Sequence, residues 1–229
     1  MWVVAASVQD LVGRVTVVSH VSDPHFLVLH SLRLKGFATE AAVAELSGLA
    51  PSEVDARLST LGSGGLAMHR EGRITGWALT PAGRELHNSS VSDDLAMAGC
   101  RSEVDDAYRR FLAVNLAFLT VCTDWQMRAG PTGEQALNDH SDGAYDASVV
   151  DRLREIDARV QPVCTDLALV MDRFAAYGPR FATALAKIDG GAYEWFTGAL
   201  IESYHTVWFE LHEDLLVTLG IKREKEGAH

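Results

Sequence analysis

The residues best suited to bind a ligand lie near the end of the chain, at helical spacing. Tyr204, Trp208 and His212 follow one another at every fourth position. His205 shares a face with Trp208 and His212, because three and seven residues turn about 300° and 700° at 100° per residue. Polar groups among aromatic rings can line a ligand pocket inside a helical bundle, or they can form a core whose histidines hydrogen-bond locally. The pattern therefore predicts an effector site and leaves a purely structural role open.

A second set of candidate effector-binding residues flanks a connection of about 18 residues, from Arg128 to Tyr145. Loops of this length inside compact bundles are often functional. Arg128 is a bidentate donor that suits a carboxylate or phosphate, so a small anionic effector would fit this site. Trp125 and His140 would complete the mouth of the pocket. The alternative is that polar residues such as Asn138 only cap and turn the chain.

The spacing gives little support for metal binding or catalysis, so we predict neither a metal nor another cofactor. His205 and His212 lie about 10.5 Å apart along a helix, too far to share one ion. Ser203 and His205 point about 200° apart, so they cannot pair as nucleophile and base. We expect the protein not to be an enzyme. Two alternatives remain: an enzyme or metal-binding protein that uses these histidines with the acidic residues around His140, and a redox sensor that uses Cys100, the cysteine expected to be most exposed.

Residues 24–90 are predicted to begin with three short helices. Two of them end at glycines, which are common helix C-caps, and the third has a proline in its first turn, where the missing N–H would be unpaired anyway. In the third helix Val54, Leu58 and Leu61 recur at i, i+4 and i+7 and form a core-facing stripe. The predicted helices cover residues 25–35, residues 40–46 and a segment that begins at Pro51.

A β-hairpin and a further helix are predicted to follow. After a glycine-rich turn the apolar pattern changes from helical to alternating, with Leu66 and Met68 on one face and with Trp77 and Leu79 matching them on the returning strand. The turn of the hairpin is expected at residues 70–73, where a glycine can adopt a positive φ. A threonine cap and a first-turn proline then begin the next helix.

This order of elements resembles a bacterial winged helix-turn-helix, as found in the MarR and PadR groups of transcriptional regulators. The resemblance is carried by Trp77-Ala78-Leu79-Thr80-Pro81-Ala82-Gly83-Arg84-Glu85 after the wing and by Leu32-Arg33-Leu34-Lys35-Gly36 in the first helix. It implies that the third helix enters the major groove while the wing touches the DNA backbone or the minor groove. Arg57, the only cation of the third helix, is the candidate for reading guanine. The residues expected to contact DNA are Ser52, Arg57, Ser59, Thr60, His69, Arg70, Arg73 and Arg84.

The charge distribution restricts DNA contact to residues 24–90. This segment carries six acidic and six basic residues, whereas residues 91–229 carry 23 acidic and 13 basic ones and would repel phosphate. A neutral module offers few phosphate contacts, so we expect a homodimer that reads a palindromic site on double-stranded DNA. The alternative is a winged-helix adaptor or regulatory module that binds a metabolic enzyme rather than DNA.

Residues 91–221 are predicted to form a helical dimerisation and effector domain. Dimerisation would most simply use the segment from Pro81 through the first long helix. This part resembles the helical domains appended to bacterial winged-helix proteins, a unit similar to those fused to pyruvate, phosphate dikinase-like proteins. The resemblance is carried by Cys122-Thr123-Asp124-Trp125-Gln126, by Asn138-Asp139-His140-Ser141-Asp142 and by residues 203–214. Its helices are expected over residues 102–128, 147–160, 162–177, 179–188 and 195–219, with Pro162 ending or kinking one of them. They follow a polar connection at 87–101, for which a partly helical structure is an alternative.

Length and composition fit a globular protein. The 229 residues are 48% hydrophobic and 22% charged, and no apolar run approaches the roughly 20 residues that cross a membrane. Residues 1–23 are expected to be an N-terminal extension without the features of a signal peptide, and residues 222–229 a frayed tail. We therefore predict a cytoplasmic, mainly α protein with a winged helix-turn-helix (three helices plus a two-stranded β-wing) followed by an α-helical bundle. Its expected function is ligand-responsive transcriptional regulation, as a dimeric repressor.

Overall fold

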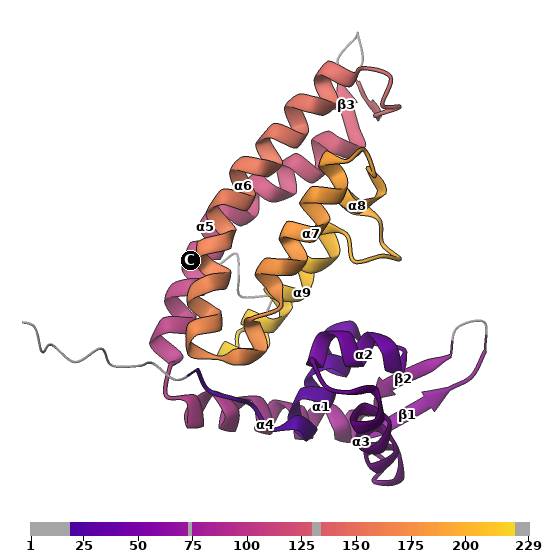
Figure 1. Cartoon of the computed structure of the whole chain (residues 1–229), viewed down its shortest axis with the longest axis vertical. Coiled ribbons are helices and arrows are strands. Elements are labelled where there is room, and N and C mark those ends of the chain that lie inside the picture. The colour runs from indigo at the N-terminus through magenta and orange to yellow at the C-terminus, as the bar shows by residue number, and fades with distance from the viewer. Residues whose placement is uncertain (1–18, 73–74, 130–133, 223–229) are drawn as a thin grey trace, which may run out of the picture.

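The structure, a computed structural model, describes residues 19–72, 75–129 and 134–222. The chain is mainly helical, as the sequence predicts. Its buried hydrophobic side chains form two separate clusters, one in the N-terminal part and one among the long helices. We call residues 24–80 the N-terminal module and residues 99–221 the bundle. Figure 1 shows the module lying below the bundle, with one helix, α4, connecting them.

The N-terminal module begins with α1 (Pro24–Lys35), α2 (Glu40–Ser47) and α3 (Pro51–Ser63). The Asp23 carboxylate accepts backbone N–H groups of the first turn of α1, and the Thr39 hydroxyl accepts one from α2. Val54, Leu58 and Leu61 of α3 are fully buried in the core of the module. The predicted core-facing stripe is therefore confirmed.

The predicted hairpin is also present, but its register differs from the prediction. The strands β1 (Ala67–Arg70) and β2 (Gly76–Leu79) are antiparallel, and Ala67 pairs with Leu79 in the core, whereas Met68 is 39% exposed. Trp77 and Leu79 therefore pair with His69 and Ala67, so the predicted match with Leu66 and Met68 is wrong by one residue on the first strand. The reason is that Leu66 lies in the turn before β1, where its N–H bonds to the last turn of α3.

The connecting helix α4 (Pro81–Ala98) begins where the sequence predicts, because the Thr80 hydroxyl accepts the Gly83 N–H at 3.1 Å. It continues to Ala98, so the polar connection predicted at 87–101, with partial helix as an alternative, is helical over most of its length. The polar residues of this stretch lie mostly on the exposed side of α4, while Leu95 packs into the core of the bundle. Gly83 allows a close approach, since a Cβ there would lie 2.0 Å from the carbonyl oxygen of Leu66.

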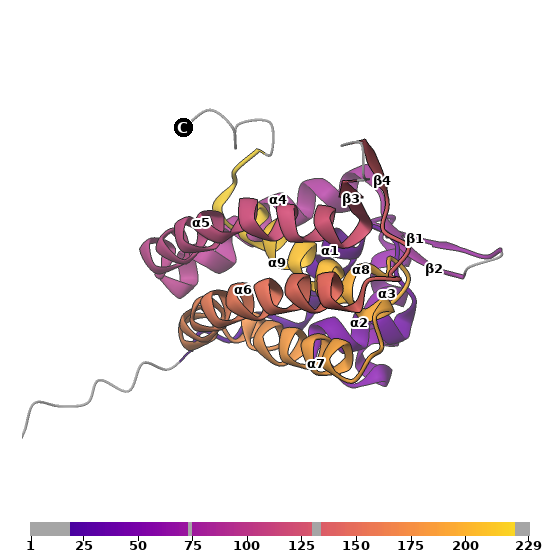
Figure 2. The same ribbon diagram turned by 90° about the horizontal axis from the view of Figure 1, so that it is seen from above.

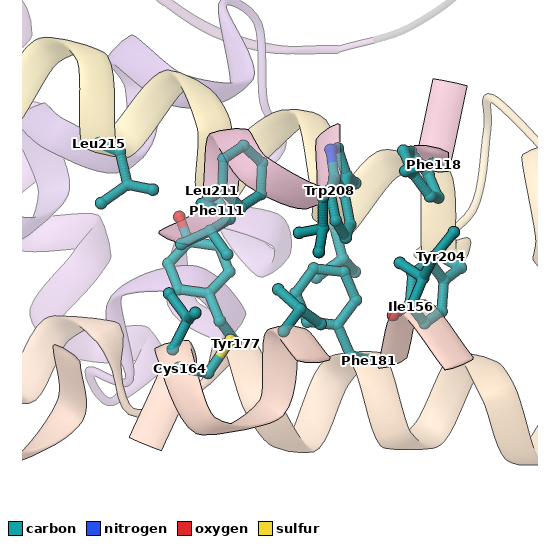
Figure 3. Packing of buried hydrophobic residues seen from close by; sticks show 14 of the residues in the cluster. Phe111, Phe118, Ile156, Cys164, Tyr177, Phe181, Tyr204, Trp208, Leu211 and Leu215 are labelled. Atoms are coloured by element: carbon teal, nitrogen blue, oxygen red, sulfur yellow. The ribbon is translucent and has the colours of Figure 1, made fainter. Parts of the chain in front are cut away.

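The bundle is built around a long helical hairpin with two further helices packed on it (Figures 1 and 2). Large aromatic side chains from several helices meet at its centre, as Figure 3 shows for Phe111, Phe118, Phe181 and Trp208. Its elements are α5 (Arg101–Gln126), α6 (Gly143–Val170), the 3-10 turn η1 (Asp172–Phe174), α7 (Tyr177–Asp189), α8 (Glu194–Thr197) and α9 (Tyr204–Leu219).

Several boundaries in the bundle differ from the predicted ones. The helix predicted over 162–177 is interrupted, because α6 ends at Val170 and η1 follows it. α6 runs through Pro162, whose side chain is exposed, so the helix loses a single backbone hydrogen bond there and continues. The predicted last helix is two helices, since the Ser203 side chain caps a new one at α9. The long connection after α5 contains a short hairpin of β3 (Met127–Ala129) and β4 (Gln135–Leu137).

Most of the predicted N-terminal extension and tail, residues 1–18 and 223–229, lies outside the described residues. Just after the first of these segments, His20 forms an isolated β-bridge with Met171, which ties the start of the described chain to the bundle. Within the described ranges, no helix combines the length and the apolar character that crossing a membrane requires.

Candidate nucleic-acid interface and interdomain cleft

The outward face of α3 is polar and accessible. The helix packs its apolar stripe chiefly against α1, α2 and β1. Ser52, Ser59 and Thr60, three of the residues expected to contact DNA, lie exposed on its other faces. In Figure 1 α3 lies on the side of the module away from the bundle, and the β1–β2 hairpin projects sideways from the same module. The structure thus leaves this face open to a partner.

Arg57, the cation of α3, lies folded along its own helix. Its Nη1 donates to the carbonyl oxygen of Glu53 at 3.1 Å, and its Nη2 lies 3.5 Å from a carboxylate oxygen of the same residue. Such an exposed pair contributes about 0–1 kcal/mol, so the guanidinium can exchange this carboxylate for another acceptor. Asp55 adds a second exposed carboxylate to α3. The helix therefore carries more negative than positive charge.

The remaining residues expected to contact DNA are divided between the hairpin and α4. His69 and Arg70 are exposed on β1, and the His69 ring packs 4.9 Å from that of Trp77. Arg73 lies outside the described residues. Arg84 is exposed in the first turn of α4 but borders a cleft between module and bundle. The accessible surface for DNA on the side of the module away from the bundle thus consists of α3 and the hairpin.

Four of the residues expected to bind an effector meet at the far end of the bundle. The rings of Trp125 and His140 lie 4.6 Å apart, and the Arg128 guanidinium lies 4.7 Å from the centre of the Tyr145 ring. Arg128 also pairs with Asp142 at 3.0 Å. Trp125 is buried, and the cation is already paired, so this group closes the end of the bundle. These four residues therefore lie close together, with Trp125 buried and His140 exposed.

Three other expected effector residues lie in the hydrophobic core. Tyr204 and Trp208 are fully buried and packed against Phe118 (Figure 3). Their polar atoms have partners within the bundle: the Tyr204 hydroxyl donates to Asp157 at 3.0 Å, and the Trp208 indole donates to Asn115 at 2.9 Å. His212 is buried beside an aromatic ring of α5. These contacts correspond to the alternative in which the aromatic residues of this helix form a core rather than a ligand pocket.

His205, by contrast, lines a cleft between the N-terminal module and the bundle. The cleft has a volume of about 760 Å³, which is within the range of small-molecule sites. Apolar side chains such as Phe209 and the exposed Leu200 form one wall, and partial burial lowers the pKa of His205. The module contributes the end of α1, with Arg33 and Lys35, and Arg84 of α4. A molecule in this cleft would touch both halves of the protein.

Ion pairs cross the walls of this cleft. Lys35 of α1 reaches Glu202 at 2.7 Å and Glu210 at 2.5 Å, and Arg180 of α7 pairs with the same two carboxylates. Arg33 of α1 lies 2.7 Å from Glu213 of α9. The bridges from Lys35 and Arg33 join α1 to the bundle, whereas those from Arg180 lie within the bundle and hold the same two carboxylates in place. The position of the module therefore depends on the pairs made by α1.

A second, buried group of charged side chains joins the two parts more deeply. Asp214 of α9 pairs with Arg173 of η1 and accepts a hydrogen bond from the Tyr177 hydroxyl at 3.0 Å. Arg173 also lies 3.5 Å from Asp94 of α4, and all of these side chains are nearly or fully buried. The guanidinium lowers the pKa of Asp214 well below its ordinary value although burial opposes this. Asp214 therefore stays ionised inside the protein.

Two histidines, one in α1 and one in α4, extend this group. His30 Nε2 lies 3.0 Å from Asp214, and His30 Nδ1 lies 2.9 Å from His87 Nε2, so one imidazole donates to the other. Nδ1 of His87 is buried without a hydrogen-bond partner among the described residues. Burial lowers the pKa of His30, and it lowers that of His87 to about 3. Both rings are therefore neutral at pH 7. Sequence reasoning missed this group; the available signal was a pair of histidines on core-facing positions of α1 and α4.

The structure gives the predicted metal alternative no preformed site. Within the described ranges, no three histidine, cysteine or acidic residues lie close enough together to hold a metal ion. All three cysteines are buried, so the expected exposure of Cys100 is wrong. Burial raises the pKa of Cys122 and of Cys164 to about 12, which keeps both thiols protonated and unreactive.

No known protein family, curated protein or solved structure matches this chain.

Proposed function

We propose that the N-terminal module is a winged helix that binds double-stranded DNA, and that the protein is a dimeric, ligand-responsive transcriptional regulator. The observation that carries the proposal is the orientation of α3. Its apolar stripe is buried in the module and its polar side chains are exposed. The helix lies on the side of the module away from the bundle, beside the projecting hairpin (Figure 1). This is the arrangement in which a helix enters the major groove while a wing contacts the flanking backbone.

The charges of the module define how it would bind. With few cations available, non-specific attraction to phosphate is weak, and affinity depends on base contacts and on two modules binding together. Arg57 would leave Glu53 and donate both of its terminal N–H groups to a guanine, a contact that discriminates by about 1–3 kcal/mol. Arg70 would meet a phosphate. We therefore expect binding that is sequence-selective but has a shallow salt dependence.

The proposed effector site is the cleft between module and bundle. A ligand that fills it would contact α1 and α9 together and would favour one orientation of the module over another. DNA would also bind one orientation of the module better than the other. Effector binding would therefore change the affinity for DNA by shifting the populations of the two orientations. Arg84, which forms no ion pair within the described residues, supports an effector that carries an anionic group.

A second candidate is an adaptor that binds a protein through the same face. The observation that favours it is the pair of carboxylates on α3, Glu53 and Asp55, because acidic groups on a recognition helix oppose phosphate. The two candidates differ in the partner of the outward face and share the rest of the architecture.

The test is selection of bound duplexes from a random-sequence library by the purified full chain, followed by fluorescence anisotropy over a series of salt concentrations. We expect one enriched motif. Arg57→Ala should weaken binding about 5–150-fold and relax the preference at one base pair. Arg70→Ala should weaken binding to all sequences alike and lower the salt slope by about 1. Arg154→Ala, an exposed arginine of α6, is the matched control and should bind as the wild type does.

Two outcomes would contradict DNA binding. One is the absence of an enriched motif together with no salt-dependent binding to any duplex. The other is an affinity that falls equally in Arg57→Ala and in Arg154→Ala. Either outcome would leave the adaptor as the remaining candidate, and a partner that stays bound to the Arg57→Ala, Arg70→Ala double variant would support it.

A further inference from the structure

The middle of α5 has an unusual exposed face. The thirteen residues from Phe111 to Thr123 include no charged side chain, although 22% of the chain is charged. One side of this stretch is buried in the core of the bundle. The other side is exposed, and Leu116 on it is 77% exposed and Leu119 39%. A surface helix normally places its charged residues on its outward side. The uncharged, partly apolar outward side of α5 therefore requires a separate explanation.

The exposed residues form a continuous stripe. At 100° per residue, Ala113, Leu116, Ala117 and Thr120 fall within about 100° of one another, on the side opposite the buried residues of α5. Three of the four are small, which lets the backbone of another helix approach closely, at an axial distance of about 8–10 Å. The fourth, Leu116, projects from the middle of the stripe. Such a surface fits another helix of the same kind.

Charged residues lie at the two ends of the stripe, with opposite signs. Arg109 lies before it and Asp124 after it, and both side chains are partly exposed. Positions 109 and 124 are equally far from the midpoint between Leu116 and Ala117. In an antiparallel pair of α5 helices centred on that midpoint, Arg109 of each copy therefore faces Asp124 of the other. A parallel pair would instead place Arg109 beside Arg109.

We propose that this α5 face is the contact of a two-fold homodimer with antiparallel α5 helices. Leu116 of each copy packs between the small residues of the other, and two Arg109–Asp124 ion pairs close the ends. Arg109 and Asp124 already pair within the chain, with Asp105 and Arg152, but such exposed pairs are weak and can be shared or exchanged. The proposal specifies the homodimer of the proposed regulator, and it does not require that the protein binds DNA.

The size of the face sets the expected strength. The stripe from Arg109 to Asp124 is about 23 Å long, which is one helix face and less than the roughly 800 Å² per partner of a stable interface. The dimer is therefore expected to be in concentration-dependent exchange with the monomer, in the micromolar range. For a regulator of this kind, binding to two half-sites on one duplex would add to this weak association.

The test is sedimentation velocity of the full chain, without DNA, from about 1 to about 100 μM. The wild type should shift from 24.9 kDa toward about twice that mass as the concentration rises. Leu116→Glu should remain monomeric throughout, because it places two carboxylates at the centre of the contact. Leu169→Glu is the matched control: this leucine is 56% exposed on α6, away from the proposed face, and its replacement should leave the association unchanged.

Charge reversal distinguishes the antiparallel pair from other arrangements. Arg109→Glu and Asp124→Arg should each weaken association at low salt, and the double variant should restore it. A wild type that stays monomeric at every concentration would overturn the proposal, and so would equal effects of Leu116→Glu and Leu169→Glu. Additive weakening in the double variant would overturn the antiparallel arrangement. Circular dichroism checks that the variants fold, and the Arg57→Ala variant should dimerise normally, which separates failure here from failure to bind DNA.

Discussion

Acidification should destabilise this protein through the histidine pair at the junction of module and bundle. His87 is fully buried, its Nε2 lies 2.9 Å from His30, and burial lowers its pKa from 6.5 to about 3. At pH 5 the unfolded chain protonates this imidazole, whereas the folded protein does not. Because the unfolded state then binds more protons, the free energy of unfolding falls as the pH falls below about 6.5.

The magnitude follows from the two pKa values. Between pH 7.5 and pH 5 the loss from His87 alone is about 2 kcal/mol. The lowered pKa of His30 acts in the same direction. For a chain of this length, 2 kcal/mol corresponds to a decrease of about 4–8 °C in Tm.

The assay is urea unfolding followed by circular dichroism at both pH values, for the wild type and for His87→Gln. Glutamine can hydrogen-bond to His30 but does not titrate, so the variant should lose about 2 kcal/mol less than the wild type between pH 7.5 and pH 5. His69→Gln, which replaces an exposed histidine of the hairpin, is the matched control and should show the wild-type dependence. If His87→Gln is as sensitive to pH as the wild type, then the argument from burial is refuted.

Three further predictions concern the junction and the core. Asp214→Asn should lower the free energy of unfolding by about 3 kcal/mol in urea titrations, because it removes the closer of the two carboxylates beside the buried Arg173 guanidinium and leaves only Asp94, at 3.5 Å. Gly83→Ala should lower the free energy of unfolding by about 3 kcal/mol, because its Cβ would overlap a backbone carbonyl. Gly99→Ala is the control: it lies at a helix end with φ +64° and open space for a Cβ, so it should cost only about 1 kcal/mol. Equal losses in the two variants would contradict the packing argument. Cys122 and Cys164 should react with a thiol reagent at pH 8 only after the protein is unfolded, and rapid labelling of the native protein would contradict their burial.

The local structure of the N-terminal module could be predicted from the sequence because it depends on short-range rules. A threonine just before a helical pattern acts as an N-cap, as Thr39 and Thr80 do for α2 and α4. The spacing of Val54, Leu58 and Leu61 gives α3 one buried face. These effects act over one or two helical turns. They need no knowledge of the rest of the chain.

The errors occurred where a distant contact outweighed a local signal. Pro162 is a strong helix breaker, yet α6 continues through it because the residues on both sides are held in the same core. The stretch after residue 87 looks like a polar connection, but Leu95 anchors it to the bundle as part of α4. The difference at β1 has a local cause instead: the Leu66 N–H bonds to the Leu61 carbonyl oxygen in the last turn of α3, so Leu66 precedes the strand.

The candidate sites divide in the same way. The accessible face of α3 follows from its own sequence, since the residues that are not apolar must face outward. The cleft at His205 and the buried group around Asp214 bring together α1, α4, η1 and α9. These elements are far apart in the chain; His30 and Asp214, for example, are 184 positions apart. A sequence pattern reports the face on which a residue lies, because that depends on the helical period. The partner that covers this face depends on how the helices pack, and only the tertiary structure decides it.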